Sequence, residues 1–377
     1  MIPFNKPHLT GKESEYVNDA IQSGKIAGDG KYTKICEAFF EKRYGFLKTF
    51  LTTSCTHAIE LAALLIDIKA GDEVIIPSYT FVSSANPFIL RGAKIVFADS
   101  SPTSPNIDIN LVEGLITPAT KAILTVHYGG IPCEVDKLRA IADKHKVFLI
   151  VDAAQTMDSF YKGKPVGSFG HLSAFSFHET KNITCGEGGL LIINDKQFVK
   201  RAEVLREKGT NRSSFIRGEI NRYQWVDTGS SYAPSDILAA YLLAQLESID
   251  TIQQRRLNIW QQYYQAFINL QHQKLVTLPF IPNGVIHNAH TFYFVLPSLN
   301  IRQKFITFMS QNGVQVQFHY IPLHDSPFYK KHHDNRKLPM ANKYKNCLVR
   351  LPLFYDMTED EVKTVIRLSL QFFQQVI

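Results

Sequence analysis

The sequence predicts an α/β protein whose larger part is built on a mostly parallel sheet. Short apolar runs alternate with helical stretches, and most of the runs end at a polar residue or a glycine. The runs are continuous rather than alternating, which is typical of strands buried on both faces. Alternation of such strands with helices indicates parallel βαβ units. The five runs are Val74–Ile76, Lys94–Ala98, Ala122–Val126, Val147–Val151 and Gly189–Ile193.

Helix candidates lie between these runs, and a longer helix candidate follows them. Residues 56–68 and 136–145 are helix candidates, and residues 236–270 form one long candidate with an apolar stripe. Prolines and a glycine after residue 278 then interrupt the chain, and strand candidates follow at 292–296 and 314–318. We therefore predict a large domain over residues 1–245 and a smaller C-terminal α/β domain over residues 246–377.

Composition favours a soluble cytoplasmic protein. The first residues lack the apolar core of a signal peptide, and no apolar stretch of about 18 residues could span a membrane. The net charge of +7 is scattered and forms no basic stripe, so we expect no nucleic-acid partner. The five cysteines are odd in number and far apart, which argues against disulfides and against a metal site.

Three segments contain the residues most suited to chemistry. Asp152 follows five apolar residues and should lie at the rim of a buried strand, although an Asp there is also a common helix cap. Lys181 follows an apolar run, and desolvation would free its amine as a nucleophile, although most lysines lie on the surface. Residues 51–58 place small hydroxyl side chains before a helix, which suits either phosphate binding or plain capping.

The combination resembles the DegT/StrS family of sugar aminotransferases over essentially the whole chain. The stretches that carry this resemblance are 71–81, 151–155 and 175–182. The resemblance implies an aspartate-aminotransferase-type fold (fold type I) that binds pyridoxal 5'-phosphate (PLP). It also implies a homodimer with active sites at the subunit interface.

The resemblance assigns roles to the matched positions. Lys181 would hold PLP covalently and then shuttle protons, and Asp152 would pair with the pyridine nitrogen and keep it protonated. Phe81 would stack on the cofactor ring. Gln155 would approach the phenolic oxygen of the cofactor. The backbone of Cys55 and Thr56, with the hydroxyls of Thr56 and Ser176, would bind the phosphate.

Substrate contacts are expected from two further segments. Lys208 and Arg212 lie in a polar, basic loop that could hold a diphosphate across a dimer interface, or could be a solvated turn. His319, Tyr320 and His324 would lie near the mouth of the active site. Ala233 stands where the family often has an asparagine that reaches the partner's cofactor phosphate, so that contact would have to come from elsewhere.

The expected reaction is transfer of an amino group from L-glutamate to C4 of a nucleotide-linked keto-sugar, dTDP-4-keto-6-deoxyglucose. Another nucleotide-sugar 3- or 4-aminotransferase is the nearest alternative. A dehydratase of the same family is a second, but one branch of these replaces the lysine with histidine, and this chain has Lys181. A non-catalytic binding protein on the same fold is a third. No G-x-G-x-x-G opens a helix after a strand, which disfavours a redox enzyme.

Overall fold

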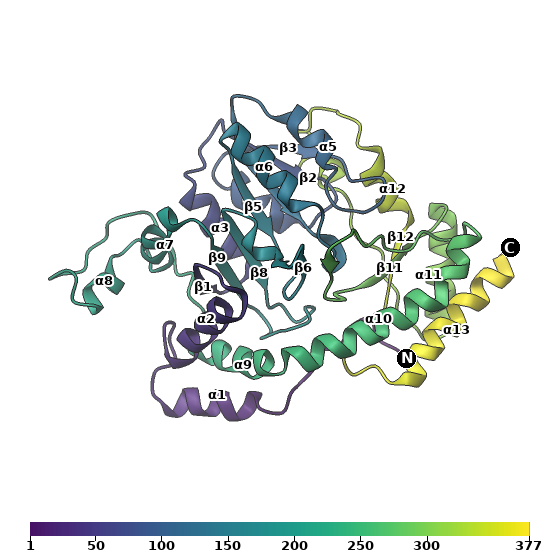
Figure 1. Cartoon of the computed structure of the whole chain (residues 1–377), viewed down its shortest axis with the longest axis horizontal. Coiled ribbons are helices and arrows are strands. Elements are labelled where there is room, and N and C mark those ends of the chain that lie inside the picture. Colours follow the sequence, from purple (N-terminus) through teal and green to yellow (C-terminus); the bar gives the residue numbers. More distant parts are fainter. Residues whose placement is uncertain (377) are drawn as a thin grey trace.

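The computed structural model describes residues 1–376 and is organised around a seven-stranded sheet (Figure 1). Only β9 runs against the other six strands, so the sheet is mixed but mostly parallel, as predicted. In spatial order the strands are β1 (Lys48–Thr52), β9 (Gly189–Ile193), β8 (Leu172–Ser176), β5 (Phe148–Asp152), β4 (Thr120–Val126), β2 (Glu73–Pro77) and β3 (Lys94–Ala98).

Helices cover both faces of this sheet, which explains why its strands are apolar throughout. Alternate residues of one strand enter different cores: Val74 and Ile76 pack on the side of α3, and Ile75 packs on the side of α2, α6 and α9. The helices up to residue 247 are α1 (Glu13–Gln22), α2 (Lys31–Tyr44), α3 (Cys55–Leu65), α4 (Asn86–Ile89), α5 (Ile109–Val112), α6 (Val135–His145), α7 (Val199–Arg206), α8 (Arg212–Ile216) and α9 (Asp236–Glu247).

The C-terminal part has its own core around a two-stranded sheet of β11 (Phe292–Val295) and β12 (Leu348–Leu351). This sheet packs among α10 (Ile249–His272), α11 (Leu299–Gln311) and α13 (Glu359–Val376), whereas the buried residues of α12 (Pro339–Cys347) join the core on the α3 side of the large sheet. Three short strands, β6 (Phe160–Tyr161), β7 (Lys164–Pro165) and β10 (Val285–Ile286), form a separate small sheet. The N-terminus also joins the C-terminal part, because Ile2 bridges to Val314. The domain boundary at residue 245 stays a prediction.

Two expected elements differ from the prediction. The long helix over 236–270 is divided at Ser248, whose backbone leaves the helical region between α9 and α10. Serine is a weak helix former because its side chain competes for backbone hydrogen bonds. Residues 314–318 form no strand, since Val314 and Gln317 each make a single bridge, to Ile2 and Arg350 respectively. Among residues 1–376, no helix is both long enough and apolar enough to cross a membrane.

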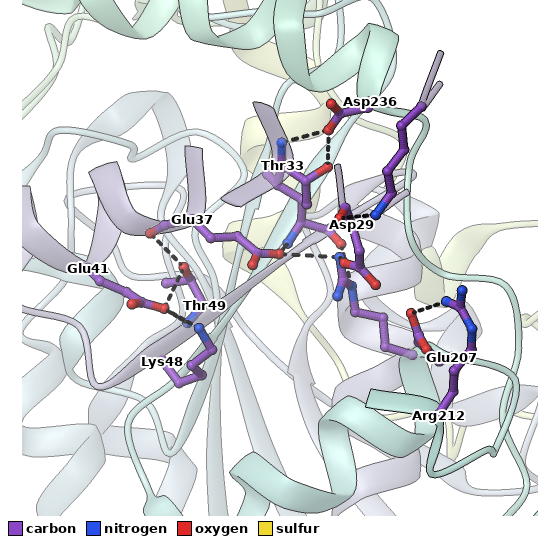
Figure 2. Close-up of polar contacts among 12 residues, drawn as sticks. Asp29, Thr33, Glu37, Glu41, Lys48, Thr49, Glu207, Arg212 and Asp236 are labelled. Atoms are coloured by element: carbon purple, nitrogen blue, oxygen red, sulfur yellow. Dashed lines mark hydrogen bonds and ion pairs between the residues drawn. The ribbon is translucent and has the colours of Figure 1, made fainter. Parts of the chain in front are cut away.

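β1 is an edge strand of the large sheet, and carboxylates of α2 cover its outer edge (Figure 2). The backbone N–H groups of Thr49 and Leu51 point away from β9, and they donate to Glu41 Oε1 at 3.0 Å and to Glu37 Oε1 at 2.9 Å. Four helical residues rise about 6 Å and two strand residues about 6.6 Å, so the two spacings match. The pairing satisfies an edge that would otherwise leave donors free.

A buried cation then links β1 to the segments around residues 29 and 207. Arg206 Nε donates to the Leu51 carbonyl at 3.1 Å, and its Nη2 lies 2.6 Å from Asp29 and 3.3 Å from Glu37. The carboxyls of Asp29 and Glu207 also share a hydrogen bond, which together with burial raises the pKa of Glu207 to about 7. Burial disfavours the charged form of Asp29, but Glu207 and Arg206 together lower the pKa of Asp29.

This carboxyl pair predicts a stability that falls as the pH rises from about 4.5 through about 7. The folded state keeps a proton on Glu207 that the unfolded chain loses near the ordinary value of 4.5, so the contribution is complete below that pH and is lost as the pH rises through about 7. In Glu207→Gln an amide N–H replaces the acid proton. We expect the wild type to lose roughly 2 °C in Tm relative to this variant between pH 6 and pH 8, measured by calorimetry. Glu15→Gln on the exposed face of α1 is the control, and coincident profiles for wild type and Glu207→Gln would contradict the shared proton.

Candidate active site

A cavity of about 640 Å³ opens where parallel strands of the large sheet end. Val126, Asp152 and Ser176 are the last residues of β4, β5 and β8, and all three line it. Residues from the C-terminal part, including His290 and Arg350, close the opposite side. Ligands of open α/β sheets bind at this edge, so the cavity is the natural candidate for an active site.

Asp152 is a fixed, buried carboxylate on the cavity wall. Its side chain accepts hydrogen bonds from Ser84 Oγ at 2.7 Å and from the Ala154 N–H at 3.1 Å. Burial raises the pKa of Asp152, and the two hydrogen bonds and the charge of Lys181 oppose that rise. The carboxyl is thus held rigidly, and a cationic group placed in the cavity would stabilise its charged form.

Lys181 lies in the connection between β8 and β9 and lines the same cavity. The adjacent Asn182 anchors this connection, because its amide donates to Gln253 Oε1 at 2.9 Å and to the Asn288 carbonyl at 2.7 Å. Burial lowers the pKa of the Lys181 amine, and the charge of Arg350 adds to the effect. A desolvated amine with a lowered pKa is the state in which lysine acts as a nucleophile and proton carrier.

The N-terminus of α3 forms an anion cradle beside these two residues. Ser54 caps the helix by accepting from the His57 N–H at 3.1 Å, and Cys55 and Thr56 begin the helix at the cavity wall. Ideal Cβ geometry at Gly189 would overlap the backbone of Ser54 and Cys55, so only glycine lets β9 approach the cradle this closely. First-turn N–H groups and the helix dipole favour a bound phosphate.

Five other predicted cofactor or substrate residues, Tyr320 among them, also line the cavity. Ser176 ends β8, and the ring of Phe81 is 56% exposed although it lies within the hollow. Gln155 is fixed from both sides: its Oε1 accepts from the Gly129 N–H at 2.7 Å and its Nε2 donates to Tyr320 Oη at 3.1 Å. His319 lines the cavity as well, with Nδ1 3.3 Å from Tyr128 Oη.

Three predicted substrate residues lie outside this cavity. His324 Nδ1 is 2.6 Å from Ser78 Oγ, and the ring borders a separate hollow of about 390 Å³. Lys208 and Arg212 belong to the segment with α8 that extends away from the body of the molecule (Figure 1). Arg212 lies 3.8 Å from Glu207. Neither lines the cavity of its own chain, so any role for them there requires a second copy.

Sequence reasoning missed several residues that the fold brings to the site. Ser84 holds Asp152, and Ser83 Oγ accepts from Thr56 Oγ1 at 2.8 Å, although both lie directly after the recognised stretch 71–81. His290 lines the cavity and its Nδ1 lies 3.1 Å from Asn182 Oδ1. Arg350 lies on β12, a strand that was not among the predicted ones. No local signal marks His290 or Arg350, because tertiary packing alone brings them here.

The residues present fit PLP. The cavity offers an anion cradle for a phosphate, a buried carboxylate for a protonated ring nitrogen, and an amine within the same enclosure. Phe81 adds an exposed aromatic face for a planar ring. The 640 Å³ volume is also within the usual range for a small-molecule site and leaves room for more than a cofactor.

Comparisons with known proteins agree with this geometry. Residues 7–368 match the sequence profile of the DegT/DnrJ/EryC1/StrS aminotransferase family. The spore coat polysaccharide biosynthesis protein SpsC of Bacillus subtilis is 33% identical over 97% of this chain and 95% of its own length. The uncharacterized protein MJ1066 of Methanocaldococcus jannaschii is also 33% identical, over 97% of this chain and 96% of its own length.

Solved structures extend the similarity to the whole fold. The PMP-form of Spr1654 from Streptococcus pneumoniae, described as a putative sugar aminotransferase, superposes with a TM-score of 0.93 at 27% identity and covers 100% of both chains. The same neighbour is also known in a PLP-form. With a family match over almost the entire length and a cavity that fits the cofactor, this chain belongs to the DegT/DnrJ/EryC1/StrS aminotransferase family of PLP-dependent sugar aminotransferases.

Proposed function

We propose that this enzyme converts dTDP-4-keto-6-deoxy-D-glucose to dTDP-4-amino-4,6-dideoxy-D-galactose, with L-glutamate as the amino donor. This is the reaction of dTDP-4-amino-4,6-dideoxygalactose transaminase in the synthesis of enterobacterial common antigen. The observation that carries an aminotransferase reaction is the enclosure of the Lys181 amine and the Asp152 carboxylate in one cavity beside an anion cradle. The choice of sugar is supported by the resemblance over 71–81, 151–155 and 175–182, and a role in polysaccharide synthesis by the name of the relative SpsC.

In this proposal each residue of the site has a separate role. Asp152 keeps the bound ring nitrogen protonated, and Ser84 keeps Asp152 in place. Lys181 binds the cofactor covalently and afterwards carries a proton to and from the reacting carbon, which its lowered pKa permits. Cys55, Thr56 and Ser176 hold the phosphate, Phe81 covers the ring and Gln155 faces its edge. PLP itself, when bound, serves as the electron sink for the carbanion left by proton loss.

Two rival activities are less well supported. A dehydratase of the branch that carries histidine at the lysine position does not fit Lys181. A non-catalytic binding protein would have no need for a desolvated amine beside a buried carboxylate, because burial of both groups costs free energy. An aminotransferase acting on a different nucleotide sugar, or at C3, is the closest competitor, since no residue described above selects C4.

We also propose a cytoplasmic homodimer whose cavities are completed by the partner. The extended segment carries Lys208 and Arg212 together with exposed apolar side chains, of which Trp225 is 79% exposed. Such a segment suits burial against a second copy, where its cations would reach the diphosphate of the sugar nucleotide. His319 and Tyr320 would contact the sugar from within the same chain. His324, which borders the separate hollow, would contribute only through Ser78.

Loss of the Lys181 amine should remove both the covalent link to PLP and the proton carrier. We expect Lys181→Ala to lose the visible absorbance of the bound cofactor on purification. Turnover should fall at least about 100-fold, the lower range for loss of a general acid–base group. Lys164→Ala, which alters an exposed lysine of β7, is the matched control and should keep both. Retention of absorbance and turnover in Lys181→Ala would remove the basis of the proposal.

The identity of the product tests the sugar assignment. Incubation of the purified enzyme with L-glutamate and dTDP-4-keto-6-deoxy-D-glucose should give a single amino sugar, with the amino group at C4 in the galacto configuration by NMR. Omission of glutamate should leave the keto-sugar unchanged. An amino group at C3, or the gluco configuration at C4, would assign the enzyme to another sugar of the same family.

The cations of the extended segment should affect sugar binding rather than chemistry. We expect Lys208→Ala and Arg212→Ala each to raise the KM for the sugar nucleotide about tenfold, with little change in kcat, because a phosphate contact made equally in ground and transition states changes binding alone. Arg222→Ala, a neighbouring arginine of the same exposed segment, tests whether any positive charge suffices. An unchanged KM in both variants would show that the segment does not hold the diphosphate.

A further inference from the structure

His290 is a histidine of the cavity wall to which the proposed function gives no role. It lies just before β11, where its N–H donates to Asn288 Oδ1 at 3.0 Å and its carbonyl accepts from Arg256 Nη2 at 2.7 Å. These two contacts fix its backbone. Its ring meets the side chain of Asn182, the residue that follows Lys181 in the chain. The imidazole is therefore held at the reacting end of the cavity.

The ring of His290 is neutral. Burial lowers its pKa, and the charges of Lys181, Arg256 and Arg350 add to the effect. A neutral imidazole has one N–H and one nitrogen lone pair, and the partners of the two nitrogens decide which nitrogen carries the proton. The tautomer thus determines whether this residue donates a hydrogen bond to a ligand or accepts one from it.

A chain of side-chain amides determines the tautomer. Gln253 Nε2 donates to the Met157 carbonyl at 3.2 Å, so Gln253 Oε1 accepts from Asn182 Nδ2 at 2.9 Å. Asn182 Nδ2 also donates to the Asn288 carbonyl at 2.7 Å. Because backbone carbonyls only accept, both amides have one orientation, and Asn182 Oδ1 is an acceptor 3.1 Å from His290 Nδ1. The proton of the ring therefore lies on Nδ1, and Nε2 carries the lone pair.

The lone pair of Nε2 is available to a ligand. Nε2 makes no hydrogen bond within residues 1–376, yet it stays accessible instead of being sealed in the interior. The residue lines the cavity and is only partly buried. An accessible acceptor whose ring is fixed through the other nitrogen suits a ligand that donates a hydrogen bond.

Among the substrate groups, a sugar hydroxyl fits this acceptor best. The groups of L-glutamate that do not react are two carboxylates, and a diphosphate also offers only acceptor oxygens, so neither can donate to an imidazole lone pair. The ribose and the diphosphate separate the N–H group of the base from the reacting sugar carbon. In the proposed keto-sugar, C3 carries a hydroxyl beside the C4 ketone, whereas C5 carries a methyl group and the ring oxygen. The C3 hydroxyl is therefore the donor nearest the reacting carbon.

We propose that His290 Nε2 accepts a hydrogen bond from the hydroxyl on the carbon next to the reacting ketone, which is C3 in the proposed substrate. The contact adds a specificity-determining residue to the sugar half-reaction and favours sugars with a free hydroxyl at that carbon. It rests on the proposed function, because it requires a keto-sugar in the cavity. Through Asn182 the acceptor is tied to the segment that carries Lys181, so the sugar hydroxyl and the reacting amine are positioned together.

Two variants separate the two nitrogens of His290. The amide of asparagine lies as many bonds from Cα as Nδ1 does, and that of glutamine lies one bond further, as Nε2 does. His290→Asn therefore keeps a donor for Asn182 but loses the acceptor, and His290→Gln can place an oxygen where Nε2 was.

The sugar half-reaction is measured by rapid mixing of dTDP-4-keto-6-deoxy-D-glucose with enzyme that carries the aminated cofactor. We expect the half-saturating sugar concentration to rise about threefold to tenfold in His290→Asn, the range for one neutral hydrogen bond, and to stay within about twofold in His290→Gln. The glutamate half-reaction of His290→Asn, started from the PLP-loaded enzyme, should keep the wild-type dependence on glutamate concentration.

An analogue without the hydroxyl gives the second comparison. dTDP-4-keto-3,6-dideoxy-D-glucose differs from the proposed substrate only at C3. The wild type should lose about the same factor with it, and His290→Asn should lose nothing further, because both changes remove one hydrogen bond. His290→Gln, which keeps an acceptor, should still distinguish the two sugars. His272→Asn, an exposed histidine at the end of α10, is the control, and cofactor content and circular dichroism confirm folding.

Three results would overturn the proposal. If the losses from His290→Asn and from the analogue multiply, His290 does not contact this hydroxyl. If His290→Asn weakens glutamate rather than the keto-sugar, Nε2 serves the amino donor instead. In both cases the wild type still aminates the keto-sugar. A wild type that fails to aminate it contradicts the proposed function itself, and this contact with it.

Discussion

The register of β1, β9 and β8 is the constraint on which the site depends. Thr52, Gly189 and Ser176 lie opposite one another across three strands, so the chain leaves β1 into the anion cradle at the same level at which β8 leads toward Lys181. A side chain at Gly189 would push the cradle away from this row. On the other flank, Ala174 of β8 lies opposite Asp152. Strand pairing thus fixes the cradle, the lysine segment and the carboxylate relative to one another.

Burial gives these groups their chemical character. Desolvation lowers the pKa of the Lys181 amine and raises that of Asp152, and each group's charge partly offsets the effect on the other. The hydrogen bond from Ser84 offsets part of the cost of burying Asp152, and the Asn182 amide, which donates to the Asn288 carbonyl, anchors the segment that carries Lys181. A cofactor with a cationic ring nitrogen and an electrophilic carbon would pair with the Asp152 carboxylate through the first and with the Lys181 amine through the second. This double match is the physical basis of PLP binding here.

The two parts of the chain contribute different functions to the cavity. The large sheet supplies the groups that hold and tune the cofactor, and the C-terminal part supplies His290, His319, Tyr320 and Arg350. Direct contacts join the parts, because Gln155 meets Tyr320 and Asn182 meets both Asn288 and His290. A substrate must therefore fit between the cofactor-binding residues of the large sheet and these residues of the C-terminal part. Changes in the C-terminal residues can alter substrate choice while the chemistry of Lys181 and Asp152 stays the same.

The sequence by itself determined the α/β class, most strand positions, and the family with its cofactor, because continuous apolar runs and short contiguous stretches such as 175–182 are local signals. It left open the antiparallel direction of β9, since a strand buried on both faces has the same apolar pattern in either direction. It also could not place Ser84 against Asp152 or Arg350 opposite Lys181, or separate His324 from Tyr320, four residues earlier. Ser84 is 68 positions from Asp152, and Arg350 is 169 positions from Lys181, so only the packing of distant segments against one another brings these residues together.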